Sequence, residues 1–277
     1  MSRKRIAVLL WMGLLLAMTP SVSAQGIVNA AVNGNEVTAQ IQLPGNISAE
    51  LVLSFEDAEG LDLNSLGLSA CLVNPNDPFL INRLMGGGLL SVPAAFPALL
   101  TIAPPANGPL SFRGLYCLSL HTNNLDYSAA VPLRLFKAPA GGVFQDITES
   151  AGPGSYRVAG TGGSFSDFLI VLDSRAQNSI IASKFDALQA GLESNAGAIT
   201  PAVLATLRNL LAEARAAYAS GAIQDTLSKI EAFSQTVKEY SGNDIPEQWL
   251  ANGTLVNVAG LLRAGGDTLK FSLSLNL

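Results

Sequence analysis

The apolar residues of this chain change their period near residue 175. Before that point, short apolar runs such as residues 37–43 alternate with polar residues, and clusters of Pro, Gly and Asn separate the runs. A period of two is typical of half-buried β-strands. After that point, apolar residues recur every three to four positions, as they do on one face of a helix. The pattern predicts an α+β chain with an antiparallel β-sandwich over residues 25–174 and an antiparallel helical bundle over residues 175–266.

The end of the chain returns to strict alternation. From residue 268 onward every second residue is apolar, and Gly265-Gly266 stand just before this run. Ten alternating residues predict a half-buried strand over residues 267–277, with the two glycines ending the preceding helix. Because a lone strand leaves its backbone groups unpaired, we expect this strand to return to an edge of the sandwich.

Residues 1–24 have the pattern of a secretory signal peptide. Three basic residues, Arg3-Lys4-Arg5, precede thirteen uncharged residues, and small residues lead up to Ala24. We expect cleavage between Ala24 and Gln25. The alternative is a membrane anchor, but the apolar run is shorter than the ~20 residues that a span requires. The pattern therefore predicts a secreted or periplasmic protein with no transmembrane anchor after removal of the signal.

The charge of the mature chain excludes one class of partner. Residues 1–24 hold three of the 16 Lys and Arg residues and none of the 21 Asp and Glu residues, so cleavage changes the net charge from −5 to −8. An acidic surface repels phosphate backbones, and we expect no nucleic acid partner. With 49% hydrophobic and 13% charged residues, the composition is also that of a folded chain.

Cys71 and Cys117 are the only cysteines of the chain, and both lie in strand-like runs. Export places a protein where disulfides persist, so a bond between them is predicted; the alternative is two buried thiols. Two Cys and one His do not supply a Cys and His zinc set. We predict no metal site and no cofactor.

The residues that could carry catalysis form no known signature. His121, the single histidine, ends a strand-like run. A Ser-His-acid triad is recognised by geometry, but no G-x-S-x-G turn is present and no Ser stands three positions before a Lys. We therefore expect His121 to be a strand-end residue held by a loop, and we predict no catalytic residue.

An acidic stretch offers a second candidate site. Glu56, Asp57, Glu59 and Asp62 lie within seven residues of one another. Paired carboxylates hydrolyse glycosides in some enzymes, and flexible carboxylate loops bind Ca²⁺ in others. The stretch lacks the spacing of an EF-hand. A solvated acidic turn between strands is the expected role, and the sequence leaves calcium binding from Glu56 to Asp62 open.

Two segments resemble known modules of bacterial surface proteins. The runs Phe144-Gln-Asp-Ile-Thr148, Ser155-Tyr-Arg-Val158 and Ser164-Phe-Ser-Asp-Phe-Leu-Ile-Val171 resemble the closing strands of Ig-like domains. The runs from Ala214 to Ile223 and from Ile230 to Val237 resemble a FIMAH-type helical module, which is appended to secreted enzymes and surface proteins. The whole chain resembles an uncharacterised family of exported bacterial proteins. These resemblances imply an Ig-like sandwich followed by a helical module, and they supply no catalytic residue.

These observations favour an exported, non-enzymatic interaction or structural protein of the bacterial envelope or its exterior. Its expected partner is a protein or another envelope component of unknown identity. The alternative is a hydrolase, or an accessory module of a secreted hydrolase. A pocket that joins His121 to a Ser and a carboxylate favours the hydrolase, whereas an apolar surface patch without such a pocket favours binding.

Overall fold

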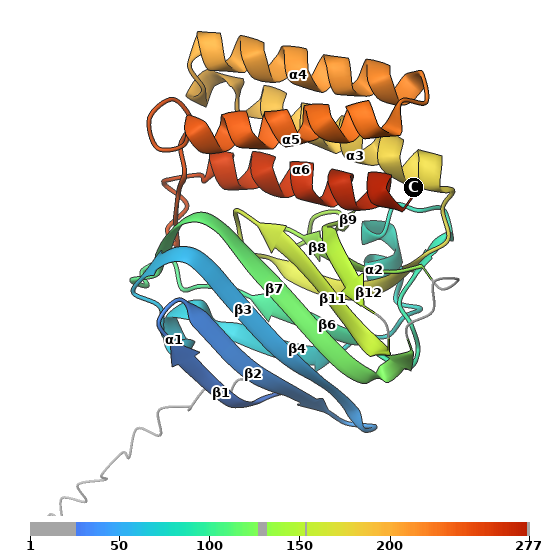
Figure 1. Cartoon of the computed structure of the whole chain (residues 1–277). Coiled ribbons are helices and arrows are strands. Elements are labelled where there is room, and N and C mark those ends of the chain that lie inside the picture. The colour runs from blue at the N-terminus through green and yellow to red at the C-terminus, as the bar shows by residue number, and fades with distance from the viewer. Residues whose placement is uncertain (1–25, 127–131, 153, 276–277) are drawn as a thin grey trace, which may run out of the picture.

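The computed structural model describes residues 26–126, 132–152 and 154–275. Within these residues the chain is mixed α and β, with six α-helices and two antiparallel sheets. Four long helices pack on one another and are together called the helical layer, and the two sheets lie beneath them (Figure 1).

The larger sheet has the strand order β1-β2-β3-β7-β11-β10. Alternation in the sequence explains its buried face, since Val37 on β2 and Leu53 on β3 are paired across the strands and both are fully buried. The strands are β1 (Ile27–Asn33), β2 (Glu36–Leu43), β3 (Ile47–Glu59), β7 (Ser111–Asp126), β10 (Thr148–Gly152) and β11 (Ser155–Gly162).

The smaller sheet has the order β4-β6-β12-β8-β9, and β5 also pairs with β12. Its strands are β4 (Leu68–Leu72), β5 (Leu90–Ser91), β6 (Ala98–Ile102), β8 (Leu133–Ala138), β9 (Gln145–Asp146) and β12 (Asp167–Asp173). The facing sides of the two sheets share one apolar core, which includes Leu53, Leu118, Tyr156, Leu100, Leu135 and Ile170.

Strand β12 is apolar on both faces because both faces are covered. Phe168 and Ile170 enter the core between the sheets, while Leu169 and Val171 enter a second apolar cluster. This second cluster includes Leu80 of the short helix α2 (Pro78–Arg83). The unbroken apolar run in the sequence is therefore a strand buried on two sides. The other short helix is α1 (Leu63–Leu66).

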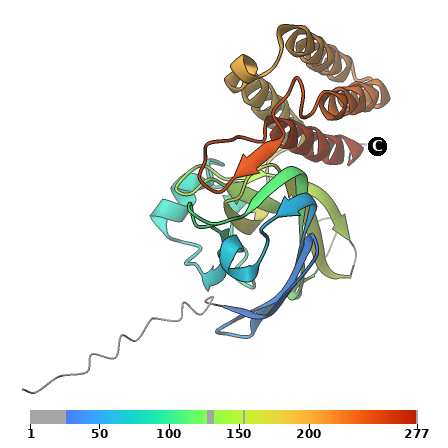
Figure 2. The same cartoon turned by 90° about the vertical axis from the view of Figure 1, so that its left-hand side faces the viewer.

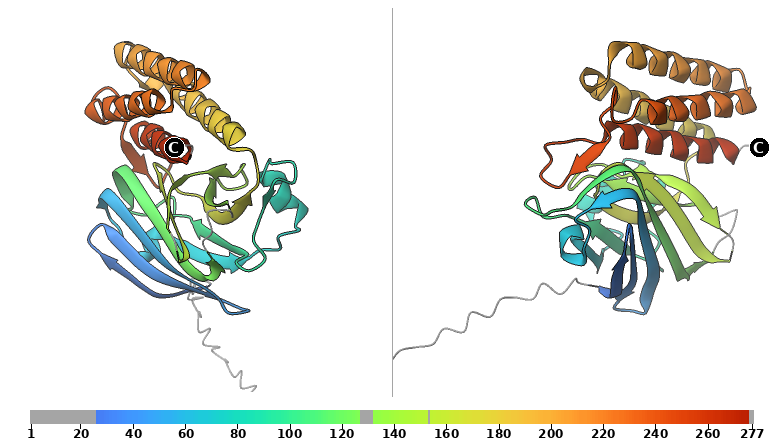
Figure 3. Two further views of the ribbon diagram at one scale, coloured as in Figure 1. Left: turned by 45° about the vertical axis from the view of Figure 1, so that its right-hand side comes forward. Right: turned by 60° about the vertical axis from the view of Figure 1, so that its left-hand side comes forward.

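The long helices are α3 (Gln177–Ser194), α4 (Pro201–Ala219), α5 (Ile223–Glu239) and α6 (Val258–Ser274). Their apolar faces meet around Leu207, Phe233 and Leu269. Between α5 and α6 the chain leaves the helical layer as β13 (Gln248–Leu250) and pairs with β7 (Figure 2). Helix α6 lies between the other helices and the sheets, against β7, β10 and β11 (Figure 3).

The predicted C-terminal strand over residues 267–277 is wrong, and so is the end of the bundle at residue 266. Residues 267–274 continue α6, and residues 276–277 lie outside the described residues. Leu262, Leu269 and Leu273 are almost fully buried, and their spacings of seven and four positions are helical. Thr268, a polar position of the alternation, is also buried because it faces the sheets. The chain does return to a sheet, but through β13.

Gly265 and Gly266 lie inside α6 and do not end a helix. A Cβ atom on Gly265 would stand 2.8 Å from Leu188 Cδ1 of α3, and one on Gly266 would stand 2.5 Å from Ser234 Oγ of α5. The two glycines therefore allow α6 to approach both neighbouring helices closely.

The predicted disulfide is also wrong, since Cys71 and Cys117 are free thiols. Cys71 lies on β4 of the smaller sheet, and Cys117 lies on β7 of the larger sheet. Their neighbours Ala70 and Leu118 point into the shared core. Because successive side chains alternate across a strand, the two cysteines point outward from opposite sheets. Burial raises the pKa of the Cys117 thiol to about 11, which keeps it protonated at neutral pH.

The predicted signal peptide and its cleavage site between Ala24 and Gln25 lie outside the described residues. Among the helices of residues 26–275 that the structure describes, none combines the length and the apolarity needed to cross a membrane.

We expect Gly260→Ala to lower the melting temperature. A Cβ atom at this position of α6 would stand 2.6 Å from the carbonyl oxygen of Gly114 on β7, which is backbone and cannot rotate away. Overpacking of this kind costs about 1–3 kcal/mol. Gly191→Ala in α3 is the matched control, because its Cβ would meet nothing within 4 Å. That change should stabilise by about 0.5–1 kcal/mol. Thermal unfolding of both variants checks the pair, and equal shifts would contradict close packing of α6 on β7.

Candidate functional site

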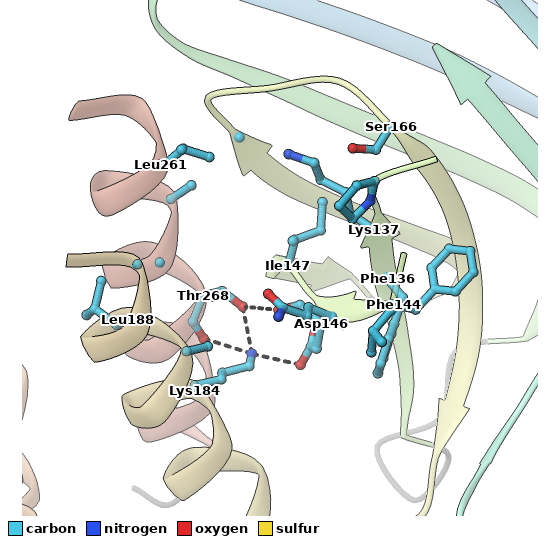
Figure 4. Close-up of a pocket in the computed structure, with 18 of the residues that line it drawn as sticks. Phe136, Lys137, Phe144, Asp146, Ile147, Ser166, Lys184, Leu188, Leu261 and Thr268 are labelled. Atoms are coloured by element: carbon cyan, nitrogen blue, oxygen red, sulfur yellow. Dashed lines mark hydrogen bonds and ion pairs between the residues drawn. The ribbon is translucent and has the colours of Figure 1, made fainter. Parts of the chain in front are cut away.

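A cavity of about 980 Å³ lies between the helical layer and the sheets. Helices α3 and α6 form one wall, and the other wall comes from β8, β9 and the loop between β11 and β12 (Figure 4). This volume is at the upper end of the ~300–1,000 Å³ typical of small-molecule sites. Much of the lining is apolar, with contributions from Phe136, Phe144, Ile147, Leu188 and Leu261.

A buried ion pair joins three elements at the cavity wall. Lys184 Nζ of α3 lies 2.7 Å from Asp146 Oδ2 of β9, and the two side chains are only 7% and 2% exposed. The same amine donates hydrogen bonds to the carbonyl oxygen (3.0 Å) and the hydroxyl (2.6 Å) of Thr268 on α6 (Figure 4). The other carboxylate oxygen accepts from Thr148 N at 2.8 Å. Burial lowers the pKa of Lys184, and the carboxylate of Asp146 opposes that shift. The charge of Lys184 is neutralised by Asp146, and its amine is hydrogen-bonded to Thr268. The role of Lys184 is therefore structural.

The second lysine of the cavity contacts a hydroxyl. Lys137 Nζ of β8 donates to Ser164 Oγ at 3.0 Å. Within the described part of the chain, no carboxylate forms an ion pair with Lys137. Burial lowers the pKa of its amine to about 7, because desolvation disfavours the charged form. Lys137 therefore differs from the other lysine of the cavity in having no carboxylate partner among the described residues, and its amine lies beside a serine hydroxyl.

The loop that carries Ser164 is held on several sides. The hydroxyl of Tyr116, which is fully buried, donates to Ser164 O at 2.8 Å. The ring of Phe165 stacks on Tyr116 with centroids 5.2 Å apart, and it packs edge-on against Trp249 of β13 at 5.0 Å. A Cβ atom on Gly163 would stand 2.6 Å from a backbone nitrogen of α6, so this position requires glycine. These contacts fix the backbone on both sides of the Ser164 hydroxyl.

His121 meets a serine and a carboxylate on the outer face of the larger sheet. Its Nδ1 lies 3.0 Å from Glu50 Oε2 on β3, and its Nε2 lies 2.5 Å from Ser155 Oγ on β11. The side chain of Glu50 is 70% exposed, and none of the three residues lines the cavity described above. A triad acid works from a buried position, where it holds the imidazole in place. This trio is therefore a polar contact across neighbouring strands.

Two carboxylates of the acidic stretch serve the fold. Glu56 accepts from Leu115 N at 3.0 Å and forms an ion pair with Arg263 of α6. Asp62 is the N-cap of α1 and accepts from two backbone N–H groups at 2.8 Å. Among the described residues, no group of three or more His, Cys, Asp or Glu side chains is arranged to hold a metal ion.

Sequence reasoning missed the contact between Lys137 and Ser164. The two residues are 27 positions apart, whereas the known sequence signature places the serine three positions before the lysine. A signal was present in the lone lysine near the end of the apolar strand Leu133–Ala138 and in the turn Gly162-Gly-Ser164. Only the pairing of β8 with β12 places the two segments together.

Large apolar side chains are exposed on α2 and on the loop that follows it, which reaches the cavity at Met85. Phe79 (83%), Ile81 (48%), Met85 (74%) and Leu89 (50%) are large apolar side chains with about half or more of their surface exposed. Met85 also lines the cavity, as does the exposed Val143. Exposed apolar surface therefore adjoins the cavity at Met85 and Val143, and clusters of exposed apolar side chains mark contact sites.

A family model for DUF6689, described as a family of unknown function, matches residues 12–276, and the chain belongs to that family. No curated protein matches the chain.

We expect Lys184→Met to destabilise the protein by about 3–5 kcal/mol, because the substitution leaves the carboxylate of Asp146 buried without its cation. Adding Asp146→Asn should restore a large part of the loss, since the amide oxygen still accepts from Thr148 N. Denaturant unfolding measures both variants. Arg208→Met, which breaks the exposed pair with Glu193, is the control and should cause a much smaller change. A double variant as unstable as Lys184→Met would argue against the buried pair.

We expect Lys137→Met to raise the melting temperature by several degrees at pH 6. The folded-state pKa of Lys137, about 7, lies below its unfolded value of ~10.4. The unfolded chain therefore binds more protons between these values, so wild-type stability rises with pH across that window and is lowest below pH 7. The gain from Lys137→Met should shrink toward pH 10. Lys229→Met on the surface is the control and should show no such gain. A pH-independent gain would contradict the desolvated amine.

Proposed function

We propose that this is an exported protein of the bacterial envelope or its exterior, and that its primary role is to bind an amphipathic ligand in the cavity. Export is supported by the signal-like pattern of residues 1–24. The ligand class is supported by the lining of the cavity, which combines apolar walls with Lys137 and Ser164. The expected occupant is an acyl compound with an apolar chain and a carboxylate or carbonyl end.

The observation that carries this proposal is that two exposed apolar side chains, Met85 and Val143, line the cavity. An apolar chain that enters beside them stays in contact with apolar surface as it passes into the cavity. The charged residues of the lining are Lys137, Asp146, Arg175 and Lys184. Lys184 is paired with Asp146 and Arg175 with Asp173, so Lys137 supplies the charge available to a ligand. An anionic or carbonyl end is the chemistry that suits it.

The proposal also assigns a type of module to each of the two layers. We assign an Ig-like sandwich to residues 25–174 and a FIMAH-like helical module to the residues that follow. The runs that resemble those modules support this assignment, and so does the change of structure between Asp173, where β12 ends, and Gln177, where α3 begins. Both modules occur in bacterial surface proteins, which fits an envelope component as the source of the ligand.

Binding of dansyl-labelled undecanoic acid tests the proposal. We expect the probe to bind the wild-type protein, with a rise in its fluorescence. Ala187→Trp should weaken binding at least about tenfold, because Ala187 is an exposed residue of α3 that lines the cavity and an indole there would occupy space that the ligand needs. Ala190→Trp is the matched control, since Ala190 lies on the same helix, is also exposed and is not part of the lining. No binding by the wild type, or equal weakening by both variants, would contradict the proposal.

A further inference from the structure

We infer that Ser164 is a nucleophile and Lys137 its general base, so that the cavity takes an acyl group from a bound ester. The inference rests on the proposed function in one respect, since the acyl compound must enter the same cavity. It goes beyond binding, because it assigns a hydrolytic activity to residues for which the sequence predicted none.

The geometry of the pair is suited to proton transfer. Lys137 Nζ and Ser164 Oγ are 3.0 Å apart, which is within the reach of a general base. Both residues line the cavity, so a carbonyl carbon of the ligand has access to the hydroxyl. The Tyr116 hydroxyl and the stacked ring of Phe165 hold the serine backbone before any ligand arrives. A fixed nucleophile beside its base is the arrangement that covalent catalysis requires.

The protonation state of the lysine also fits this role. An ordinary lysine is charged at neutral pH and cannot accept a proton, whereas burial brings the pKa of Lys137 to about 7. The other charged residues of the lining form ion pairs, since Lys184 is paired with Asp146 and Arg175 with Asp173. Beneath the amine lies the ring of Tyr116, 5.6 Å from Nζ, and burial raises the pKa of its hydroxyl so that it stays protonated. Lys137 is therefore the group of this cluster that exchanges a proton near pH 7.

The reaction balances without a cofactor. Ser164 Oγ forms a bond to the ester carbonyl carbon, its proton moves to Lys137 Nζ, and the carbonyl π electrons move to the oxygen. The new ammonium lies beside this negative oxygen and stabilises it. Collapse of the intermediate breaks the carbon–oxygen bond to the leaving alcohol, which takes the proton from Lys137. Water then attacks the acyl carbon while Lys137 Nζ takes its proton. The bond between that carbon and Ser164 Oγ breaks, Oγ takes the proton back from Lys137, and a carboxylic acid is released.

The trio on the outer sheet face supplies an internal control. Ser155 also contacts a base, His121 Nε2, but it lies outside the cavity lining. If a serine of this protein reacts because of a nearby base alone, Ser155 should react as well. If reactivity also requires a position in the cavity lining, Ser164 should react and Ser155 should not.

Incubation of the full chain with p-nitrophenyl butyrate tests the inference. We expect release of p-nitrophenolate and a butyryl group on Ser164, detected by intact mass and located by peptide mapping. Ser164→Ala should abolish both signals, and Ser155→Ala should leave them unchanged. Lys137→Met should slow acylation by about 10²-fold or more, the usual contribution of a general base. In the wild type, the rate should rise about tenfold between pH 6 and pH 8, as the neutral fraction of Lys137 increases.

The outcomes separate this inference from the proposed function. Acylation of Lys137 or Ser155 in place of Ser164, no acylation at all, or a rate that does not follow the titration of Lys137 would overturn the inference. Binding of the dansyl probe to Ser164→Ala, measured in parallel, tests the cavity without the nucleophile. Binding without acylation leaves the proposed function in place, whereas acylation without probe binding supports the dyad and rejects the ligand class. A melting curve for each variant confirms that it is folded.

Discussion

Helix α6 is buried on two sides, against the other helices and against the sheets. Most of the architecture depends on how the side chains of α6 pack against both. Toward the other helices it presents Leu262 and Leu269, and its glycines allow close approach. Toward the sheets it presents polar groups that are buried and paired. Asn257 accepts from Gly260 N and donates to Gly114 O of β7, and Thr268 donates to Thr148 O at 2.9 Å. Buried polar groups are tolerated only with such partners, so these contacts fix the position of the helical layer on the sheets.

The position of the helical layer on the sheets also determines the burial and the polar partners of the two lysines of the cavity. Lys184 is buried where α6, α3 and β9 meet, and a carboxylate, a hydroxyl and a carbonyl surround it. Lys137 lies on the same cavity with a hydroxyl as its polar partner, and its pKa falls to about 7. A fold that needed only stability would carry an apolar residue at such a position. Groups that cost stability in a concave site are candidates for function, so Lys137 and not Lys184 is the candidate functional residue.

Local patterns in the sequence predicted the elements whose surroundings are simple. Strand β2, with one buried face, alternates as expected over residues 37–43. The prediction for the C-terminal segment was wrong because the spacing of Leu269 and Leu273 fits either a strand or a helix. Which of the two forms depends on the polar contacts that α6 makes with the sheets. The prediction of the disulfide was wrong for a related reason. Spacing along the chain does not say that Cys71 and Cys117 face outward from different sheets. The contact of Lys137 with Ser164 likewise follows from strand order alone.

The cavity exists because segments distant in the sequence complete one another. The sheets supply Lys137 and the loop of Ser164, but α3 and α6 close the space above them. The chain between α5 and α6 also reaches back to that loop, since Trp249 of β13 packs against Phe165. The helical segment therefore both encloses the cavity and supports the backbone of its serine. Separated from the helices, the sheets would lose one wall of the cavity and one support of the loop together, so the two layers form one structural unit.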